Sequence, residues 1–372
     1  MSYNDNSLGR FLSPGLVDGF ITRLTNSWRG EKPWAALRPL GALYGYGAWL
    51  RRRYYARFFR VEKADRPVVA IGNLTVGGSG KTPLCLALAK LLIARGHQPA
   101  VLSRGYGRRR LSDAPVVVSR GDGPVSALAE SGDEPWLMAS QLAGLRIVVD
   151  SRRARAAQLA VEELEADLLL LDDGFQHLGL AADCRVLLVP ARNPFGNGAV
   201  LPAGPLREPL SAHKMAHILV STGAERPAPE VTELAMGRPV FAAEYHPAGW
   251  TPLLEGGPVT PPESLAGKRV YAFCGLGRPD SFERSLKKLD LDVRRFVALR
   301  DHQRYGRDVL DALGLDFMAS GAELLVTTAK DAVKIPAGAF PLPVMVLNME
   351  MGLNHPAEFV GTVMNIAAGR NR

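Results

Sequence analysis

The chain has 372 residues, of which 47% are hydrophobic and 22% charged, and its formal net charge is +8. These proportions exclude an intrinsically disordered chain, and the length allows two domains, each with its own core. The three cysteines, Cys85, Cys184 and Cys274, are far apart and form no C-x-x-C pair, which argues against a disulfide framework or a zinc knuckle and favours a reducing compartment.

Positive charge is concentrated in an N-terminal arm, which we place at residues 1–65. Residues 1–66 contain 12 Lys/Arg against 5 Asp/Glu, so the remainder of the chain is close to neutral. Between Trp28 and Phe59, aromatic and leucine side chains alternate with arginines. A basic arm of this kind indicates an acidic partner surface, either anionic lipid or nucleic acid.

The apolar content of the arm favours a membrane surface. The uncharged run Pro39–Leu50 would span about 18 Å as a helix, which is too short to cross a hydrocarbon core of roughly 30 Å. We therefore predict a helix that lies in the membrane interface. A helix packed on the protein's own core is the alternative. Nucleic acid is not expected as a partner, because no helix-turn-helix, zinc-finger or RNA-binding signature accompanies the arginines.

A phosphate-binding loop follows the arm. The apolar run Pro67–Ile71 predicts a buried strand and Leu84–Ala94 predicts a helix, with a glycine-rich turn between them. The nucleotide-binding residues predicted in this turn are Thr75, Val76, Gly77, Gly78, Ser79, Gly80, Lys81 and Thr82. Thr75 stands where the G-x-x-x-x-G-K-[ST] pattern has glycine, so the loop matches the G-G-x-G-K-T form instead. Lys81 would reach phosphate oxygens, and the Thr82 hydroxyl would ligate Mg²⁺.

Strands and helices alternate through the rest of a predicted P-loop domain, residues 66–212, which indicates a parallel sheet covered on both faces. The expected elements are strands at Pro99–Ser103, Val116–Val118, Ile147–Val149, Leu168–Leu171 and Val186–Val189, and a helix at Ser151–Leu164.

Carboxylates lie next to two of the expected elements. Asp172 and Asp173 come directly after the Leu168–Leu171 run, where a carboxylate beside a P-loop would hold Mg²⁺. Asp133 precedes an expected helix near Trp136 and could be either a helix N-cap or a general base. The spacing by itself favours the cap.

Prolines between Pro202 and Pro229 mark a boundary. We expect a second, smaller α/β domain at residues 213–350 and a C-terminal helix at residues 351–372. The second domain should contain strands at Val270–Phe273, Phe296–Leu299, Leu324–Thr327 and Val344–Leu347. His302, which follows Asp301 after the second of these runs, is either structural or a proton relay.

Taken together, these motifs resemble the tetraacyldisaccharide 4'-kinase family. The segments that carry the resemblance are Trp28–Gly30, Gly72–Pro83, Ser103–Gly107, Gly132–Pro135, Asp172–His177, Asn193–Gly198, Leu201–Pro209, Asp301–His302 and Thr328–Lys334. Their order matches that of the family over most of the chain. Ala329 departs from it, because the family usually has glutamate at this position.

The resemblance implies transfer of the γ-phosphoryl group of ATP, with Mg²⁺, to the 4'-hydroxyl of an acylated glucosamine disaccharide 1-phosphate. Because each exposed CH₂ of such a lipid costs roughly 0.8 kcal/mol, the enzyme would work at the cytoplasmic face of the bacterial inner membrane as a peripheral or monotopic protein. No protein partner is indicated.

The resemblance also implies roles for individual residues. Asp172 and Glu208 would complete the metal site with Thr82. Lys81 and Arg207 would neutralise the charge of the transferring phosphoryl group. Asp133 would be the general base, oriented or assisted by His302, with Asp173 as a second possible partner.

Two other functions share parts of this pattern. One is a P-loop kinase for a soluble acceptor, with the arm packed on the protein. The other is a membrane-bound ATPase switch resembling the division-site ATPases, which share G-G-x-G-K-T. Those ATPases carry a signature lysine just before the glycine pair, whereas this chain has Val76 there.

Overall fold

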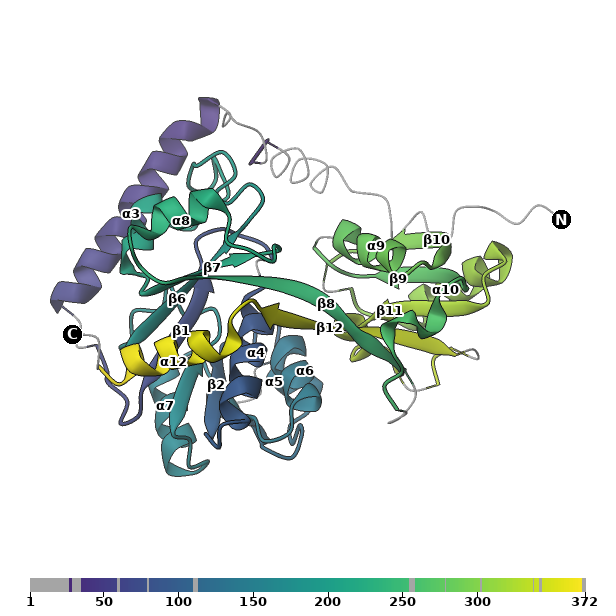
Figure 1. Ribbon diagram of the computed structural model, residues 1–372, viewed down its shortest axis with the longest axis horizontal. Helices are drawn as coiled ribbons and strands as arrows, with labels where there is room; N and C mark the ends of the chain where they lie inside the picture. The colour runs from purple at the N-terminus through teal and green to yellow at the C-terminus, as the bar shows by residue number, and fades with distance from the viewer. Residues whose placement is uncertain are drawn as a thin grey trace. The chain divides into compact units, whose positions relative to one another are not determined.

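The computed structural model describes residues 27–28, 35–58, 61–78, 80–109, 113–253, 258–277, 279–301, 303–336, 338–340 and 343–369. Within these residues the chain forms two compact units. Unit 1 runs from His246 to Glu350, and unit 2 comprises the described residues up to Tyr245 together with those from Met351 onward. The chain passes from one unit to the other twice, once within the long strand β8 and once within the long strand β12 (Figure 1).

Unit 2 contains a sheet with the strand order β8-β7-β6-β1-β5-β2-β4-β3. Its strands are β1 (Val68–Asn73), β2 (Pro99–Ser103), β3 (Val116–Arg120), β4 (Arg146–Val149), β5 (Leu168–Leu171), β6 (Cys184–Pro190), β7 (Ile218–Thr222) and β8 (Val240–Pro252). Neighbouring strands are parallel except for β3, which is antiparallel to β4 at the edge of the sheet. β1 is central, because its backbone pairs with β5 on one side and β6 on the other. The predicted α/β fold with a P-loop domain is confirmed.

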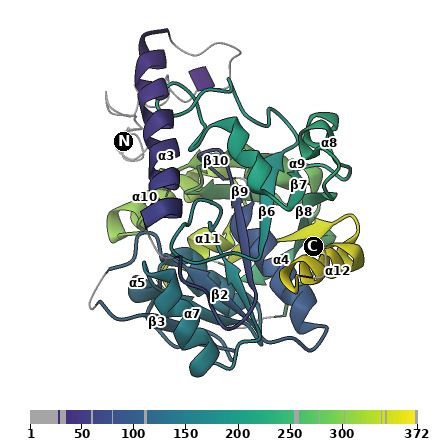
Figure 2. The ribbon, with the colours of Figure 1, turned by 90° about the vertical axis from the view of Figure 1, so that its left-hand side faces the viewer.

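Helices cover both faces of this sheet. The helices of unit 2, apart from the N-terminal one, are α4 (Lys81–Ile93), α5 (Leu128–Ser131), α6 (Asp133–Gln141), α7 (Arg153–Glu162), α8 (Pro229–Ala235), α12 (Pro356–Ala367) and the short 3₁₀ helix η2 (Leu210–Met215). Successive β1 residues face opposite sides: Val69 packs in one core with α4 and α12, and Val68 packs in another with α7. Figure 2 shows α4 and α12 together on one side of these strands.

Unit 1 is a smaller α/β unit whose strands follow the order β10-β9-β11-β12, all parallel. Its elements are η3 (Pro262–Leu265), β9 (Arg269–Cys274), α9 (Pro279–Lys288), β10 (Asp292–Ala298), α10 (Arg307–Ser320), β11 (Leu324–Thr328), α11 (Ala329–Ala332) and β12 (Val344–Leu353). The predicted second α/β domain is thereby confirmed as a fold.

The division between the units differs from the predicted boundary at 212/213. It falls at Tyr245–His246, because β7 pairs with β6 and the first half of β8 pairs with β7, which extends the P-loop sheet. The C-terminal helix α12 is not a separate part either, since Phe359 and Val363 lie in the same core as α4. The short strand β7 and the start of β8 were not expected from the sequence.

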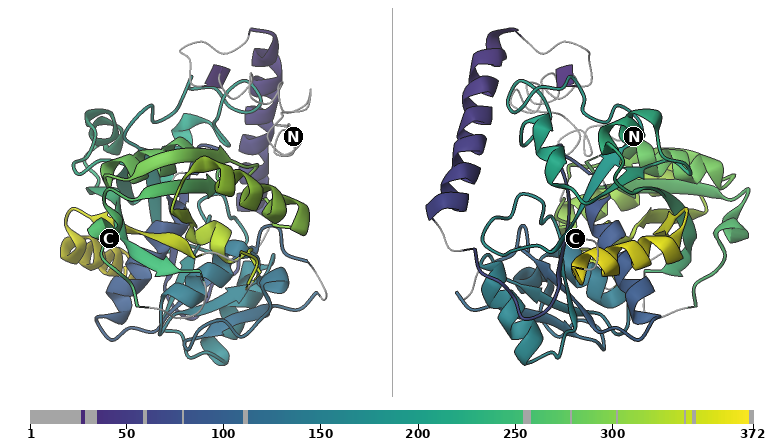
Figure 3. Two further views of the ribbon diagram at one scale, coloured as in Figure 1. Left: turned by 90° about the vertical axis from the view of Figure 1, so that its right-hand side faces the viewer. Right: turned by 60° about the vertical axis from the view of Figure 1, so that its left-hand side comes forward.

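The N-terminal helix is α3 (Arg38–Phe58), preceded by the single turn η1 (Ala35–Leu37). Figure 3 shows it lengthwise as a straight helix at the margin of unit 2. Arg52 links α3 to the rest of unit 2, because its guanidinium donates a hydrogen bond to the buried carboxylate of Glu208. Many large apolar side chains of α3 stay exposed. Among the described helices, none is both long enough and apolar enough to span a membrane.

A substitution at Gly72 tests the packing of β1 against Phe175. An ideal Cβ on Gly72 would lie 2.6 Å from Phe175 Cβ and 2.9 Å from its backbone nitrogen. We expect Gly72→Ala to lower the free energy of unfolding by about 1–3 kcal/mol, because backbone must shift to relieve the overlap. Urea denaturation measures the change. Gly47→Ala in α3 is the matched control, since no atom lies within 4 Å of its added Cβ. A loss at Gly72 no larger than at Gly47 would contradict the packing described.

Candidate active site

The phosphate-binding loop leaves β1 at Asn73 and re-enters regular structure at Lys81, the first residue of α4. The Asn73 side-chain amide donates to the Thr75 carbonyl oxygen (2.7 Å) and to Thr75 Oγ1 (3.1 Å). Gln176 in turn donates to the Asn73 carbonyl oxygen (2.7 Å). Gly80 has φ +86°, which glycine adopts without the strain that a Cβ would bring. Of the predicted loop residues, Ser79 lies outside the described part of the chain.

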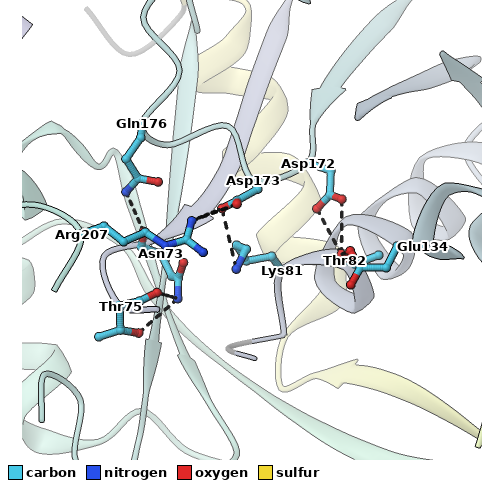
Figure 4. Close-up of polar contacts among 9 residues, drawn as sticks. All are labelled: Asn73, Thr75, Lys81, Thr82, Glu134, Asp172, Asp173, Gln176 and Arg207. Carbon is cyan, nitrogen blue, oxygen red and sulfur yellow. Dashed lines mark hydrogen bonds and ion pairs between the residues drawn. The ribbon is translucent and has the colours of Figure 1, made fainter. Parts of the chain in front are cut away.

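Lys81 and Arg207 converge on the carboxylate of Asp173 (Figure 4). Arg207 Nη1 lies 3.0 Å and 2.9 Å from the two Asp173 oxygens, and Lys81 Nζ lies 3.7 Å from Oδ1. Burial acts to raise the pKa of Asp173, but the charges of Lys81 and Arg207 outweigh it and lower the pKa below its ordinary value. Asp173 is therefore ionised and holds both cations beside the loop.

Three oxygen-bearing side chains meet at the start of α4 (Figure 4). Thr82 Oγ1 lies 3.2 Å from Glu134 Oε2 and 3.3 Å from each oxygen of Asp172. Asp172 follows β5 and is buried. Its pKa is raised to about 7, chiefly by burial and then by the charges of Glu134 and Asp173, with Lys81 and Thr82 opposing the shift. Two carboxylates thus crowd one hydroxyl.

This arrangement fits a magnesium ion. Hydroxyl and carboxylate oxygens are hard ligands, and Mg²⁺ is commonly held by one or two carboxylates together with substrate phosphates and water. Within the described ranges no group of three or more His, Cys, Asp or Glu side chains could hold a metal. A cation at Thr82, Glu134 and Asp172 would therefore take its other ligands from a nucleotide and water.

Glu134 was missed as a site residue, and Glu208, predicted as a metal ligand, lies elsewhere. The structure brings Glu134 to Thr82, because both residues sit in the first turn of their helices, α6 and α4. Arg207 points to Asp173, whereas the next residue, Glu208, accepts from Arg52 of α3. The signal that could have identified Glu134 was its place beside Asp133 in the Gly132–Pro135 motif.

Asp133 is the first residue of α6, and the N-cap is Gly132, without a side-chain capping bond. The interpretation of Asp133 as an N-cap is therefore wrong, because the helix begins one residue earlier than a capping role requires. Gly132 has φ +88°, and an ideal Cβ there would lie 3.0 Å from the Tyr106 carbonyl oxygen. The conformation and this close approach explain why glycine precedes α6. A role of Asp133 as general base stays a prediction.

Asp301, the neighbour of the predicted partner His302, belongs to unit 1. Asp301 Oδ1 accepts a hydrogen bond from Lys330 Nζ (3.1 Å). His302 lies outside the described residues. The three cysteines are free and buried, in agreement with the expectation that they form no disulfide framework.

His177, at the end of the Asp172–His177 motif, lies in a positively charged environment. Burial, and then the charges of Arg153, Arg104 and Arg51, lower its pKa to about 4. Its Nε2 atom is buried and has no hydrogen-bond partner among the described residues. His177 is therefore neutral in the folded chain at neutral pH.

The fold and the site define a P-loop nucleotide-binding protein of the α/β class, with carboxylates arranged around the P-loop threonine as phosphoryl transfer requires. More narrowly, residues 33–367 match the family described as Tetraacyldisaccharide-1-P 4'-kinase, and the chain belongs to this family. The family resemblance predicted from the sequence motifs is confirmed.

Individual relatives agree over most of the chain. The tetraacyldisaccharide 4'-kinase of Anaeromyxobacter dehalogenans (strain 2CP-C) is 44% identical over 329 residues, covering 83% of this chain and 85% of the relative. That of Geobacter sulfurreducens is 40% identical over 349 residues, covering 90% and 96%. The crystal structure of the "apo" form of LpxK from Aquifex aeolicus in complex with ATP aligns with a TM-score of 0.72 and 31% identity, covering 89% of this chain and 98% of that chain.

Lys81→Ala tests the phosphate-binding loop. We expect turnover to fall by about 10²-fold or more, because a preorganised cation that stabilises the transferring charge is removed. The melting temperature should change little, since Lys81 lies at the helix start and only its weak pairing with Asp173 is lost. Lys90→Ala near the other end of α4 is the matched control and should retain activity. Full activity of Lys81→Ala would refute the assignment.

His177→Gln tests the local electrostatics. The pKa of His177 is 6.5 in an unfolded chain and about 4 in the folded chain. Between these pH values the unfolded chain binds a proton that the folded chain does not, so the free energy of unfolding falls as the pH decreases. His177→Gln has no imidazole to protonate, so this decrease in stability is absent from the variant. Between pH 7.5 and pH 5, we expect its free energy of unfolding to fall by roughly 1–2 kcal/mol less than that of the wild type. Equal losses, measured by urea denaturation, would show that the histidine is not held neutral.

Proposed function

We propose that this chain transfers the γ-phosphoryl group of ATP to the 4'-hydroxyl of a tetraacyldisaccharide 1-phosphate, a step of lipid A biosynthesis. The observation that carries the proposal is the meeting of Thr82, Glu134 and Asp172 beside a P-loop lysine. Family membership supports the acceptor, and the similar Aquifex aeolicus structure in complex with ATP supports the donor.

The nucleotide would be held by the loop between β1 and α4. Backbone N–H groups at a helix N-terminus bind phosphate oxygens, and α4 begins directly after Gly80. On nucleotide binding, Lys81 and Arg207 would release the Asp173 carboxylate and bind phosphate oxygens instead, because the more highly charged triphosphate competes for the same two cations. Thr82, Glu134 and Asp172 would hold Mg²⁺. The ion would supply neutralisation of charge that develops on the triphosphate during transfer.

Asp133 would accept the proton of the acceptor hydroxyl. It neighbours Glu134 in the first turn of α6, so the proton acceptor and a proposed metal ligand come from adjacent residues. In the proposed step the 4'-oxygen attacks the γ-phosphorus, the bond to the β–γ bridging oxygen breaks, and ADP leaves with that oxygen. The proton passes to Asp133, with His302 proposed to orient or assist it.

Asp133→Asn should separate this role from a structural one. We expect kcat to fall by about 10²–10⁴-fold, because the amide cannot accept the proton, while the dissociation constant for ATP changes little. Asp122→Asn, on an exposed loop of the same unit, is the control and should behave as wild type. If Asp133→Asn lowers the melting temperature but keeps kcat, the residue is structural.

We also propose that α3 binds the membrane that contains the acceptor, at the cytoplasmic face of the inner membrane. The apolar side chains of α3 that lie largely in solvent are Leu40 (53% exposed), Leu43 (68%), Tyr46 (58%), Trp49 (49%), Tyr54 (53%) and Phe58 (68%). Arg51 and Arg53 stack on Tyr55 and Trp49, so charge and rings occur together. Aromatic rings with adjacent arginines suit the headgroup region of an anionic bilayer.

Vesicle flotation tests this surface. With vesicles that contain anionic lipid, the wild type should float, and a variant carrying Leu43→Ser, Trp49→Ser and Phe58→Ser should stay largely in the dense fraction, because it loses three large exposed apolar side chains of α3. Leu315→Ser with Met318→Ser removes exposed apolar groups of α10 and is the control. Equal flotation of both variants would contradict the proposal that α3 binds the membrane.

The reaction itself is tested with ATP labelled at the γ-phosphate and the acylated disaccharide 1-phosphate in detergent micelles. The proposal expects label in the organic-phase lipid, on the 4'-position. Release of labelled phosphate without labelled lipid would indicate an ATPase switch. Labelling of a soluble sugar in preference to the lipid would indicate a kinase for another acceptor.

A further inference from the structure

Two residues far from the P-loop in sequence contact its last glycine. Tyr245 lies in the middle of β8 and Met351 near the end of β12, and neither belongs to a nucleotide-binding motif. An ideal Cβ on Gly80 would lie 3.2 Å from the Tyr245 hydroxyl oxygen and 2.6 Å from Met351 Cε. The closing turn of the loop is therefore covered by a phenol and a thioether from the other end of the sheet.

Tyr245 differs from Met351 in carrying a hydrogen-bond donor. The residue is 39% exposed as a whole, but its hydroxyl is the part that approaches Gly80. Burial, and then the negative charge of Glu134, raise the pKa of Tyr245 above its ordinary value. The phenol is therefore a hydrogen-bond donor placed beside Gly80.

Gly80 occupies a position where small displacements affect phosphate binding. It is the N-cap of α4, and its backbone lies among the N–H groups that a P-loop offers to phosphate. Its left-handed conformation and the tight contact with Met351 leave no room for a side chain. A side chain that packs against Gly80 and is within the electrostatic influence of Glu134 would link the phosphate-binding backbone to a proposed metal ligand.

We propose that Tyr245 is a nucleotide-positioning residue, whose hydroxyl, seated against Gly80 and near Glu134, holds the end of the P-loop and this carboxylate in the arrangement that receives Mg-ATP. The inference rests on the proposed use of ATP and adds to it a residue that acts through the loop and through Glu134. A hydrogen bond from a neutral phenol to a charged acceptor is stronger than one between neutral groups.

Binding of a fluorescent ATP analogue with Mg²⁺, without acceptor, tests the inference directly. Tyr245→Phe removes only the hydroxyl, and we expect the dissociation constant to rise about three- to tenfold, the effect that loss of one hydrogen bond made in the nucleotide-bound state would produce. In turnover assays the KM for ATP should rise by a similar factor, while kcat, the KM for the lipid acceptor and the melting temperature stay close to wild type. An unchanged dissociation constant would overturn the inference.

Two further variants separate positioning from packing. Met351→Leu keeps an apolar contact on Gly80, and it should bind the analogue nearly as the wild type does. A loss equal to that of Tyr245→Phe would assign the effect to packing and overturn the role of the hydroxyl. Tyr271→Phe removes a phenol that donates to Asp316 in unit 1 (2.7 Å); it should lower the melting temperature without changing the affinity for the analogue.

Failure of the proposed function gives a different pattern. If the wild type binds the Mg²⁺ analogue but never phosphorylates the lipid, the proposed reaction is contradicted. The comparison of Tyr245→Phe with the wild type in the binding assay still decides the inference, because that assay contains no acceptor.

Discussion

The site depends on the crowding of two carboxylates around one hydroxyl. Glu134 and Asp172 both lie within 3.3 Å of Thr82 Oγ1, and burial, followed by the negative charges of Glu134 and Asp173, raises the pKa of Asp172 to about 7. Such an arrangement is unfavourable for the carboxylates by themselves and becomes favourable when a cation shares them. The same protein region places Lys81 and Arg207 on the neighbouring carboxylate, Asp173.

The sheet accounts for this convergence. β1 pairs with β5 in parallel register, so the loop after β1 and the carboxylates after β5 emerge at the same edge. Gly132 packs against the Tyr106 backbone directly before α6, whose first residues are Asp133 and Glu134. The α3 helix is joined to the same unit by the bond from Arg52 to Glu208, one residue after the arginine that holds Asp173. The proposed membrane-binding helix is thus bonded to the residue that follows the proposed phosphate-binding arginine.

Local signals made much of this predictable. The P-loop, the strand before Asp172 and the α/β alternation follow from short runs of apolar residues and from glycine spacing, and the structure has them where the sequence indicates. The site partners that were missed depend on contacts between distant segments. Glu134 is recognisable only once α6 lies beside α4, and Tyr245 only once β8 extends the sheet. The unit boundary was misplaced for the same reason, since the pairing of β7 with β6 cannot be derived from prolines near Pro209.

The most direct measurement of the central claim uses Mn²⁺ in place of Mg²⁺. Protein with ¹³C-labelled aspartate and glutamate carboxyl groups is mixed with Mn²⁺ and an ATP analogue, and the coupling of the metal to carboxyl carbon is recorded by electron–nuclear double resonance. The account predicts a carboxyl coupling in the wild type that weakens in Glu134→Gln and in Asp172→Asn but persists in Glu208→Gln. A spectrum in which Glu208→Gln removes the coupling, while the other two variants keep it, would contradict the site described.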